Sequence, residues 1–101
     1  MSQACELKLD AETGYINVCG DLTFTTVNGL LVSARRVFAP IEVLDIDLAD
    51  VTCSDSAGLA LLIEWMRSAT QNSKNIVFHN IPPQMLAMAH ASGLDDLLPL
   101  Q

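Results

Sequence analysis

The feature that most constrains this chain is a switch in the spacing of its apolar residues, between a period near 3.6 and a period of two. Between Val27 and Phe38 the apolar residues recur three or four positions apart, which predicts an amphipathic helix that ends before Pro40. Between Val43 and Leu48 they alternate with Asp45 and Asp47, which predicts a strand with one apolar face. A helix followed directly by such a strand indicates an α/β fold.

The same two periods assign the rest of the chain. The predicted bounds are 5–11 and 15–19 for two strands of a hairpin, 52–56 for a polar turn, 57 to about 72 for a central helix, 75–79 for a short strand, and Pro82-Pro83 to Gly93 for a last helix. This order predicts right-handed crossovers that build a mixed sheet with helices packed against it. Because 101 residues suit one core and no linker or repeat interrupts them, we expect residues 1–101 to form a single domain.

Charge and composition exclude several classes of function. Five Lys and Arg against twelve Asp and Glu leave a formal net charge of −7, which opposes binding to nucleic acid and to anionic lipid surfaces. No apolar run reaches the roughly 18 to 20 residues of a membrane span, and residues 1–6 do not resemble a secretory signal. Three cysteines without a Cys-x-x-Cys pair indicate free thiols in a reducing compartment. We therefore expect a cytoplasmic protein without direct membrane insertion, in which Cys53 is a small buried residue.

The residue types that carry enzyme chemistry occur only singly. His79 and His90 each stand alone, without the Cys, Asp or Glu spacing of a metal site. The five glycines are scattered, and they form neither a dinucleotide-binding fingerprint nor a phosphate-binding loop. The sequence therefore predicts no catalytic residues, no metal and no cofactor, and a protein that is not an enzyme.

The most informative polar cluster is Ser54-Asp55-Ser56, followed by the small residues Ala57 and Gly58, where a strand passes into the central helix. One interpretation is structural, because Asp or Ser at a helix N-cap accepts backbone N–H groups. The other is functional. A serine hydroxyl exposed at a helix N-terminus suits phosphorylation, and two small residues let a partner surface approach closely. The residues alone leave both interpretations open.

The central helix offers a second candidate surface. At 100° per residue its core stripe is predicted to hold Leu59, Leu62, Ile63, Met66 and Thr70. Leu61 and Trp65 lie one turn apart and widen that stripe on one side. Tryptophan is favoured both in binding hot spots and at the edge of a core. The sequence therefore leaves open whether this shoulder is a docking surface or part of the core.

The Asp-Ser-Ala-Gly-Leu motif over 55–59 and the order of the predicted elements resemble the STAS domain family, the fold of the anti-sigma-factor antagonists. Within that family the stretches 20–24, 55–62 and 93–99 are most similar to the MlaB-like branch. The resemblance covers nearly the whole chain and implies the STAS fold. In the antagonists, the hydroxyl residue directly after the Asp is phosphorylated by a partner kinase. That position is Ser56 in this chain.

The MlaB-like resemblance also implies a function. It describes a non-catalytic cytoplasmic subunit that binds and supports the MlaF-like ATPase of an ABC transporter, which moves phospholipids between the inner and outer membranes. The protein would then lie peripheral to the inner membrane through its partner, with Ser56 at or near the ATPase contact. The expected partner-binding residues beside it are Ser54, Asp55, Ala57, Gly58, Leu61 and Trp65. The alternative is an anti-sigma-factor antagonist, which a kinase-type anti-sigma factor switches by phosphorylating Ser56.

Overall fold

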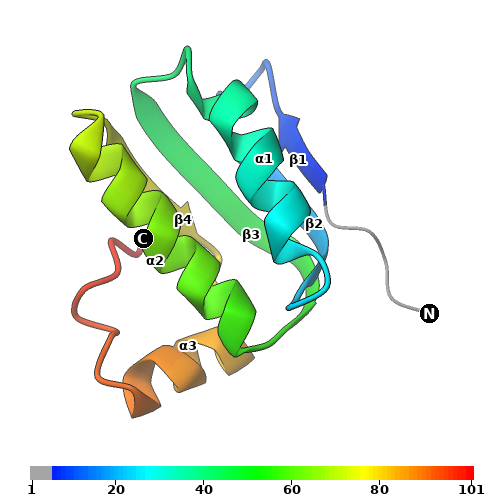
Figure 1. Ribbon diagram of the computed structural model, residues 1–101, viewed down its shortest axis with the longest axis vertical. Coiled ribbons are helices and arrows are strands. Elements are labelled where there is room, and N and C mark those ends of the chain that lie inside the picture. The colour runs from blue at the N-terminus through cyan, green and yellow to red at the C-terminus, as the bar shows by residue number, and fades with distance from the viewer. Residues whose placement is uncertain (1–5) are drawn as a thin grey trace.

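The computed structural model describes residues 6–101 and shows the predicted α/β class (Figure 1). In chain order the elements are β1 (Glu6–Leu9), β2 (Ile16–Leu22), α1 (Val27–Phe38), β3 (Val43–Ser54), α2 (Ser56–Gln71), β4 (Asn75–His79) and α3 (Pro83–Ala91). Cys5, the first residue of the predicted hairpin, lies outside the described residues. Within residues 6–101, no helix has both the length and the apolarity needed to cross a membrane.

The strands form one mixed sheet in the order β1-β2-β3-β4. β1 pairs with β2 antiparallel, as the predicted hairpin requires, whereas β2–β3 and β3–β4 are parallel. Parallel neighbours need a crossover connection, and α1 and α2 supply the two crossovers. Figure 1 shows α1 and α2 side by side over one face of the sheet. The expected mixed sheet with helices packed against it is therefore confirmed.

β3 is longer than its sequence pattern predicts. It continues past Leu48 to Ser54, so residues 52–54, expected in the polar turn, are strand. The added half pairs with the end of β2, where Gly20 faces Val51 and Leu22 faces Ser54, after register shifts in the ladder. Backbone hydrogen bonds to β2 hold this half of the strand. They do not require its side chains to alternate between apolar and polar, so the sequence pattern did not predict it. The polar turn accordingly shortens to Asp55 alone.

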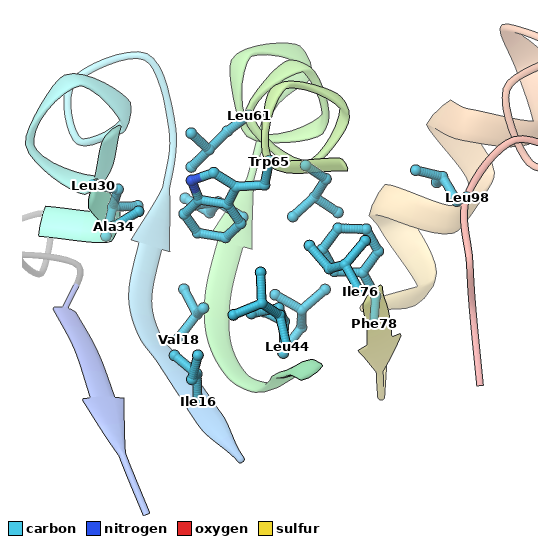
Figure 2. Close-up of a cluster of buried hydrophobic side chains, with 14 of the residues drawn as sticks. Ile16, Val18, Leu30, Ala34, Leu44, Leu61, Trp65, Ile76, Phe78 and Leu98 are labelled. Carbon is cyan, nitrogen blue, oxygen red and sulfur yellow. The ribbon is translucent and has the colours of Figure 1, made fainter. Parts of the chain in front are cut away.

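The core lies between the sheet and the two crossover helices (Figure 2). Ile16 and Ile46 of the sheet, Leu30 of α1 and Leu62 of α2 are at most 1% exposed. Burial of one such side chain stabilises the fold by roughly 1.5 to 3 kcal/mol. The core therefore fixes how both helices sit on the sheet, and with them the start of α2.

The buried stripe of α2 is rotated relative to the prediction. Leu59 and Leu62 are buried as expected, whereas Ile63 and Met66 are only half-buried and Thr70 is exposed. The buried positions of α2 are Gly58, Leu59, Leu61, Leu62, Trp65 and Ala69. The cause is α1, which provides a second apolar surface beside the sheet. The rings of Trp65 and Phe38 meet edge to face there, with centroids 5.3 Å apart.

Candidate partner-binding site

A single residue, Asp55, separates β3 from α2, and its carboxylate organises the turn. Oδ1 accepts the backbone N–H groups of Ala57 at 2.9 Å and of Gly58 at 3.2 Å. Oδ2 accepts the backbone N–H of Phe24 from the loop between β2 and α1, at 3.1 Å. The N-cap interpretation of Asp55 is thereby confirmed. The same carboxylate also fastens two loops together at one end of the sheet.

Ser56 is the first residue of α2 and is exposed. Asp55 takes up the N–H groups of the two residues that follow Ser56, so the serine hydroxyl is not needed as the cap. A group added to this hydroxyl would stand at the positive end of the helix dipole. The geometry therefore leaves Ser56 accessible both to a modifying enzyme and to a partner surface.

The neighbouring loop carries a residue that the sequence analysis missed. Phe24 is 78% exposed, in the tight turn between β2 and α1. Thr26 fixes this turn, because its Oγ1 donates to the Asp21 carbonyl at 2.8 Å and accepts the Thr23 N–H at 2.9 Å. An exposed aromatic ring on a rigid turn is typical of an interface anchor. The sequence signal that could have indicated Phe24 was an aromatic residue among the threonines at 23, 25 and 26.

Four of the residues predicted to contact a partner are buried in the structure. Leu61 and Trp65 are each 3% exposed and belong to the core between α2 and α1, so they do not form an exposed docking shoulder. Ser54 is 6% exposed, and its Oγ has no hydrogen-bond partner among residues 6–101. Gly58 is buried because α2 lies directly against the backbone of β2 at this point. Asp55, Ser56 and Ala57 remain reachable from outside.

A hydrogen-bonded group of β2 and β3 side chains lies next to the turn. Asp21 Oδ1 accepts the Thr52 hydroxyl at 2.7 Å and the Cys53 thiol at 3.3 Å. The hydrogen bond to Asp21 raises the pKa of the Cys53 thiol, and the charge of Asp21 adds to this effect. Cys53 is exposed, which corrects the expectation of a buried residue. Cys53 lies near the end of β3, and therefore close to the turn at Asp55.

We expect Cys53 to react slowly with iodoacetamide, because a raised pKa lowers the fraction of reactive thiolate. In Asp21→Asn the rate at Cys53 should rise, since the lost carboxylate no longer stabilises the thiol form. Peptide-resolved mass spectrometry over a time course measures this rate, with Cys19 as the internal reference. An unchanged Cys53 rate in Asp21→Asn would show that Asp21 does not control the thiol.

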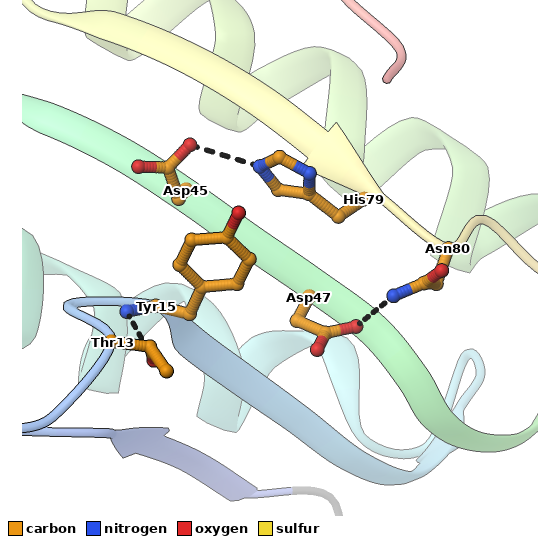
Figure 3. Close-up of polar contacts among 6 residues, drawn as sticks. All are labelled: Thr13, Tyr15, Asp45, Asp47, His79 and Asn80. Carbon is orange, nitrogen blue, oxygen red and sulfur yellow. Dashed lines mark hydrogen bonds and ion pairs between the residues drawn. The ribbon is translucent and has the colours of Figure 1, made fainter.

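The face of the sheet opposite α1 and α2 carries a separate polar cluster (Figure 3). His79 Nε2 lies 2.9 Å from Asp45 Oδ1, and the His79 ring stacks on Tyr15 with centroids 4.6 Å apart. Asn80 donates to Asp47 at 3.0 Å. Asp45 of β3 and Tyr15, which directly precedes β2, thus hold His79. Within the described range 6–101, no group of three or more His, Cys, Asp or Glu side chains is arranged to bind a metal ion.

Comparison with known proteins identifies the family of the chain. The family model described as "Mlab, STAS domain" matches residues 5–99. The chain belongs to the MlaB-like STAS domain family. No curated protein matches it in sequence.

Solved structures place the MlaB-like chain in the STAS fold. The anti-sigma factor antagonist SpoIIAA in its unphosphorylated form matches with a TM-score of 0.71 and 19% identity, over 97% of this chain and 88% of that one. The Bacillus cell fate determinant SpoIIAA in the phosphorylated form matches with a TM-score of 0.65 and 21% identity, over 97% and 91%. At this level of identity the likeness establishes the common fold.

Proposed function

We propose that this protein is the non-catalytic subunit that binds and supports the ATPase of a phospholipid-moving ABC transporter. The observation that carries the proposal is the exposed Ser56 beside the exposed Phe24, on a rigid turn of an MlaB-like STAS domain. In this function the protein is cytoplasmic and peripheral to the inner membrane through its partner. The contact comprises Phe24, Asp55, Ser56 and Ala57.

The physical form of the turn supports a docking role. Asp55 ties the loop of Phe24 to the start of α2, so both loops present a single preorganised surface. Preorganisation lowers the entropy lost on binding, because few side chains need to be ordered at the contact. Phe24 supplies apolar area, and the small side chains of Ser56 and Ala57 let a partner approach the helix end closely.

A second function is favoured by a specific observation. The SpoIIAA structures are those of an anti-sigma factor antagonist, in an unphosphorylated and in a phosphorylated form. Ser56 is exposed at the start of α2, so a kinase can reach its hydroxyl. In that function a phosphate on Ser56 would add negative charge beside Asp55 and block docking to an anti-sigma factor.

Co-purification of the tagged protein from its native host distinguishes the two functions. The proposal predicts recovery of an ABC-type ATPase together with unmodified Ser56, both identified by mass spectrometry. Recovery of a kinase-type anti-sigma factor together with phosphorylated Ser56 would replace the transporter function by the signalling one. A Phe24→Ala sample prepared in parallel serves as the control, because a specific partner should be depleted from it.

A further inference from the structure

The residues of the proposed contact form too small a surface to hold a partner by themselves. Phe24 and Ser56 are exposed there, and Asp55 and Ala57 are half-buried. Stable interfaces bury roughly 800 Å² on each partner, contributed by about 20 to 30 residues. A partner that docks on this turn must therefore also cover surface beside it, and the neighbouring elements decide which surface that is.

The side of α2 that begins at Ser56 leads away from the turn without a charge. At 100° per residue, Ala60 and Ile63 follow Ser56 on the same side of the helix. Ala60 is exposed and Ile63 is half-buried. No residue from Ser56 to Ile63 is Asp, Glu, Lys or Arg. The surface next to the turn on α2 is therefore small and apolar.

The next element along this surface is α3, which lies against α2 at the same end of the molecule as Ser56 (Figure 1). Met85 and Ala89 are fully buried and attach the helix to the core. None of its nine residues is Asp, Glu, Lys or Arg, and only Gln84 and His90 are polar. The exposed faces of α1 and α2, by contrast, carry Arg or Glu. Among the three helices, α3 alone has an exposed face without formal charge from these residue types.

The outer face of α3 is mostly apolar. Leu86 is 38% exposed, and Ala87 and Ala91 are also exposed. A helix that is apolar on its outer side as well as its inner side is typical of one that packs against further surface. At the end of the helix, His90 Nδ1 lies 2.8 Å from Asp95 Oδ2. An apolar centre with polar groups at its rim is the common arrangement of a protein interface.

We propose that the contact with the ATPase continues from the Ser56 turn along Ala60 and Ile63 onto the outer face of α3, where the ATPase presents an uncharged, apolar surface. This extension rests on the proposed function, because both surfaces are assigned to one partner. A partner that covers Ser56 also reaches α3, since α3 adjoins α2 at that end. Charged groups placed opposite α3 would lose hydration without gaining a counter-charge, so an apolar partner surface fits best.

Ala87→Arg tests this surface on the full chain. It places a charge on the outer face of α3 and leaves the helix intact, because arginine is also a strong helix former. We expect its affinity for the purified ATPase, measured by calorimetry, to fall at least about tenfold, because the charge would be desolvated in the contact. Its urea midpoint should match that of the wild type. Val32→Arg is the matched control, since it adds the same charge at a 68% exposed position of α1 and should bind like the wild type.

Leu86→Ser is a second variant, which adds no charge and removes apolar area from α3. Its affinity should fall about threefold or more, and this result decides the matter if Ala87→Arg fails to fold. Wild-type affinity in the folded α3 variants would overturn the extension. If Ser56→Glu still bound weakly in the same titrations, the proposed function would stand without it. A wild-type chain that did not bind the ATPase would overturn both. Self-association of the free chain that Ala87→Arg abolished, with its ATPase affinity unchanged, would assign α3 to a second copy and so also overturn the extension.

Discussion

Replacing Gly58 with alanine should destabilise the fold by about 2 kcal/mol. A Cβ at this position would lie 2.4 Å from the Leu22 carbonyl oxygen and 3.1 Å from Leu22 Cγ. That carbonyl also accepts the N–H of Asp55, so it cannot move away without weakening the join between β2 and the turn. Overpacking of this kind costs about 3 kcal/mol, and the better helix propensity of alanine returns about 1 kcal/mol.

Gly29→Ala is the matched control, because a Cβ at that helical position meets nothing within 4 Å. It should leave stability unchanged or raise it by about 0.5 to 1 kcal/mol. Urea unfolding followed by the fluorescence of the single tryptophan gives both values. The Gly58→Ala midpoint should fall, and its melting temperature should drop by about 10 °C. Equal stability of the two variants would show that α2 does not lie tightly on β2.

The second large effect is expected at Phe24. Phe24→Ala should weaken partner binding by at least about tenfold, because interface anchors of this kind contribute 2 kcal/mol or more to affinity. It should change the free energy of unfolding by less than about 0.5 kcal/mol, since the side chain is 78% exposed. Affinity is measured by calorimetry with the co-purified partner, and stability by urea unfolding.

Val32→Ala is the control for Phe24→Ala. Val32 lies on α1 and is 68% exposed. The Val32→Ala variant therefore removes a similarly exposed apolar side chain from a different surface. Its affinity should match that of the wild type. If both variants bound the partner equally well, Phe24 would lie outside the contact, and the proposed site would reduce to the turn at Ser56.

Periodic segments with clear stop signals were predictable from sequence. The helix over 27–38 and the strand over 75–79 were predicted at the bounds that the structure shows. Pro40 limits the helix, because proline has no backbone N–H to donate and its ring clashes with the preceding helical turn. The second half of β3 could not be found in this way, because it is held by backbone pairing with β2 and its side chains do not alternate.

The candidate site was predictable only in part. The motif around Asp55 and Ser56 marked the turn, since cap residues act locally. Phe24 was missed because its role depends on which loop meets the turn, and that contact spans 31 positions of the chain. The orientation of Trp65 depends on Phe38 in another helix. The burial of Trp65 follows from packing between two helices, and the apolar pattern of a single helix does not predict such a contact.

The most direct test of whether the start of α2 binds the ATPase is the affinity of the purified ATPase for Ser56→Glu compared with Ser68→Glu. Both variants add one carboxylate to an exposed position of α2, and Ser68 lies about 18 Å further along the helix. Ser56→Glu should bind about tenfold more weakly than the wild type, because the added charge stands beside Asp55 within the proposed contact. Ser68→Glu should bind like the wild type. Wild-type affinity in Ser56→Glu would contradict the central claim, because the start of α2 would then lie outside the interface.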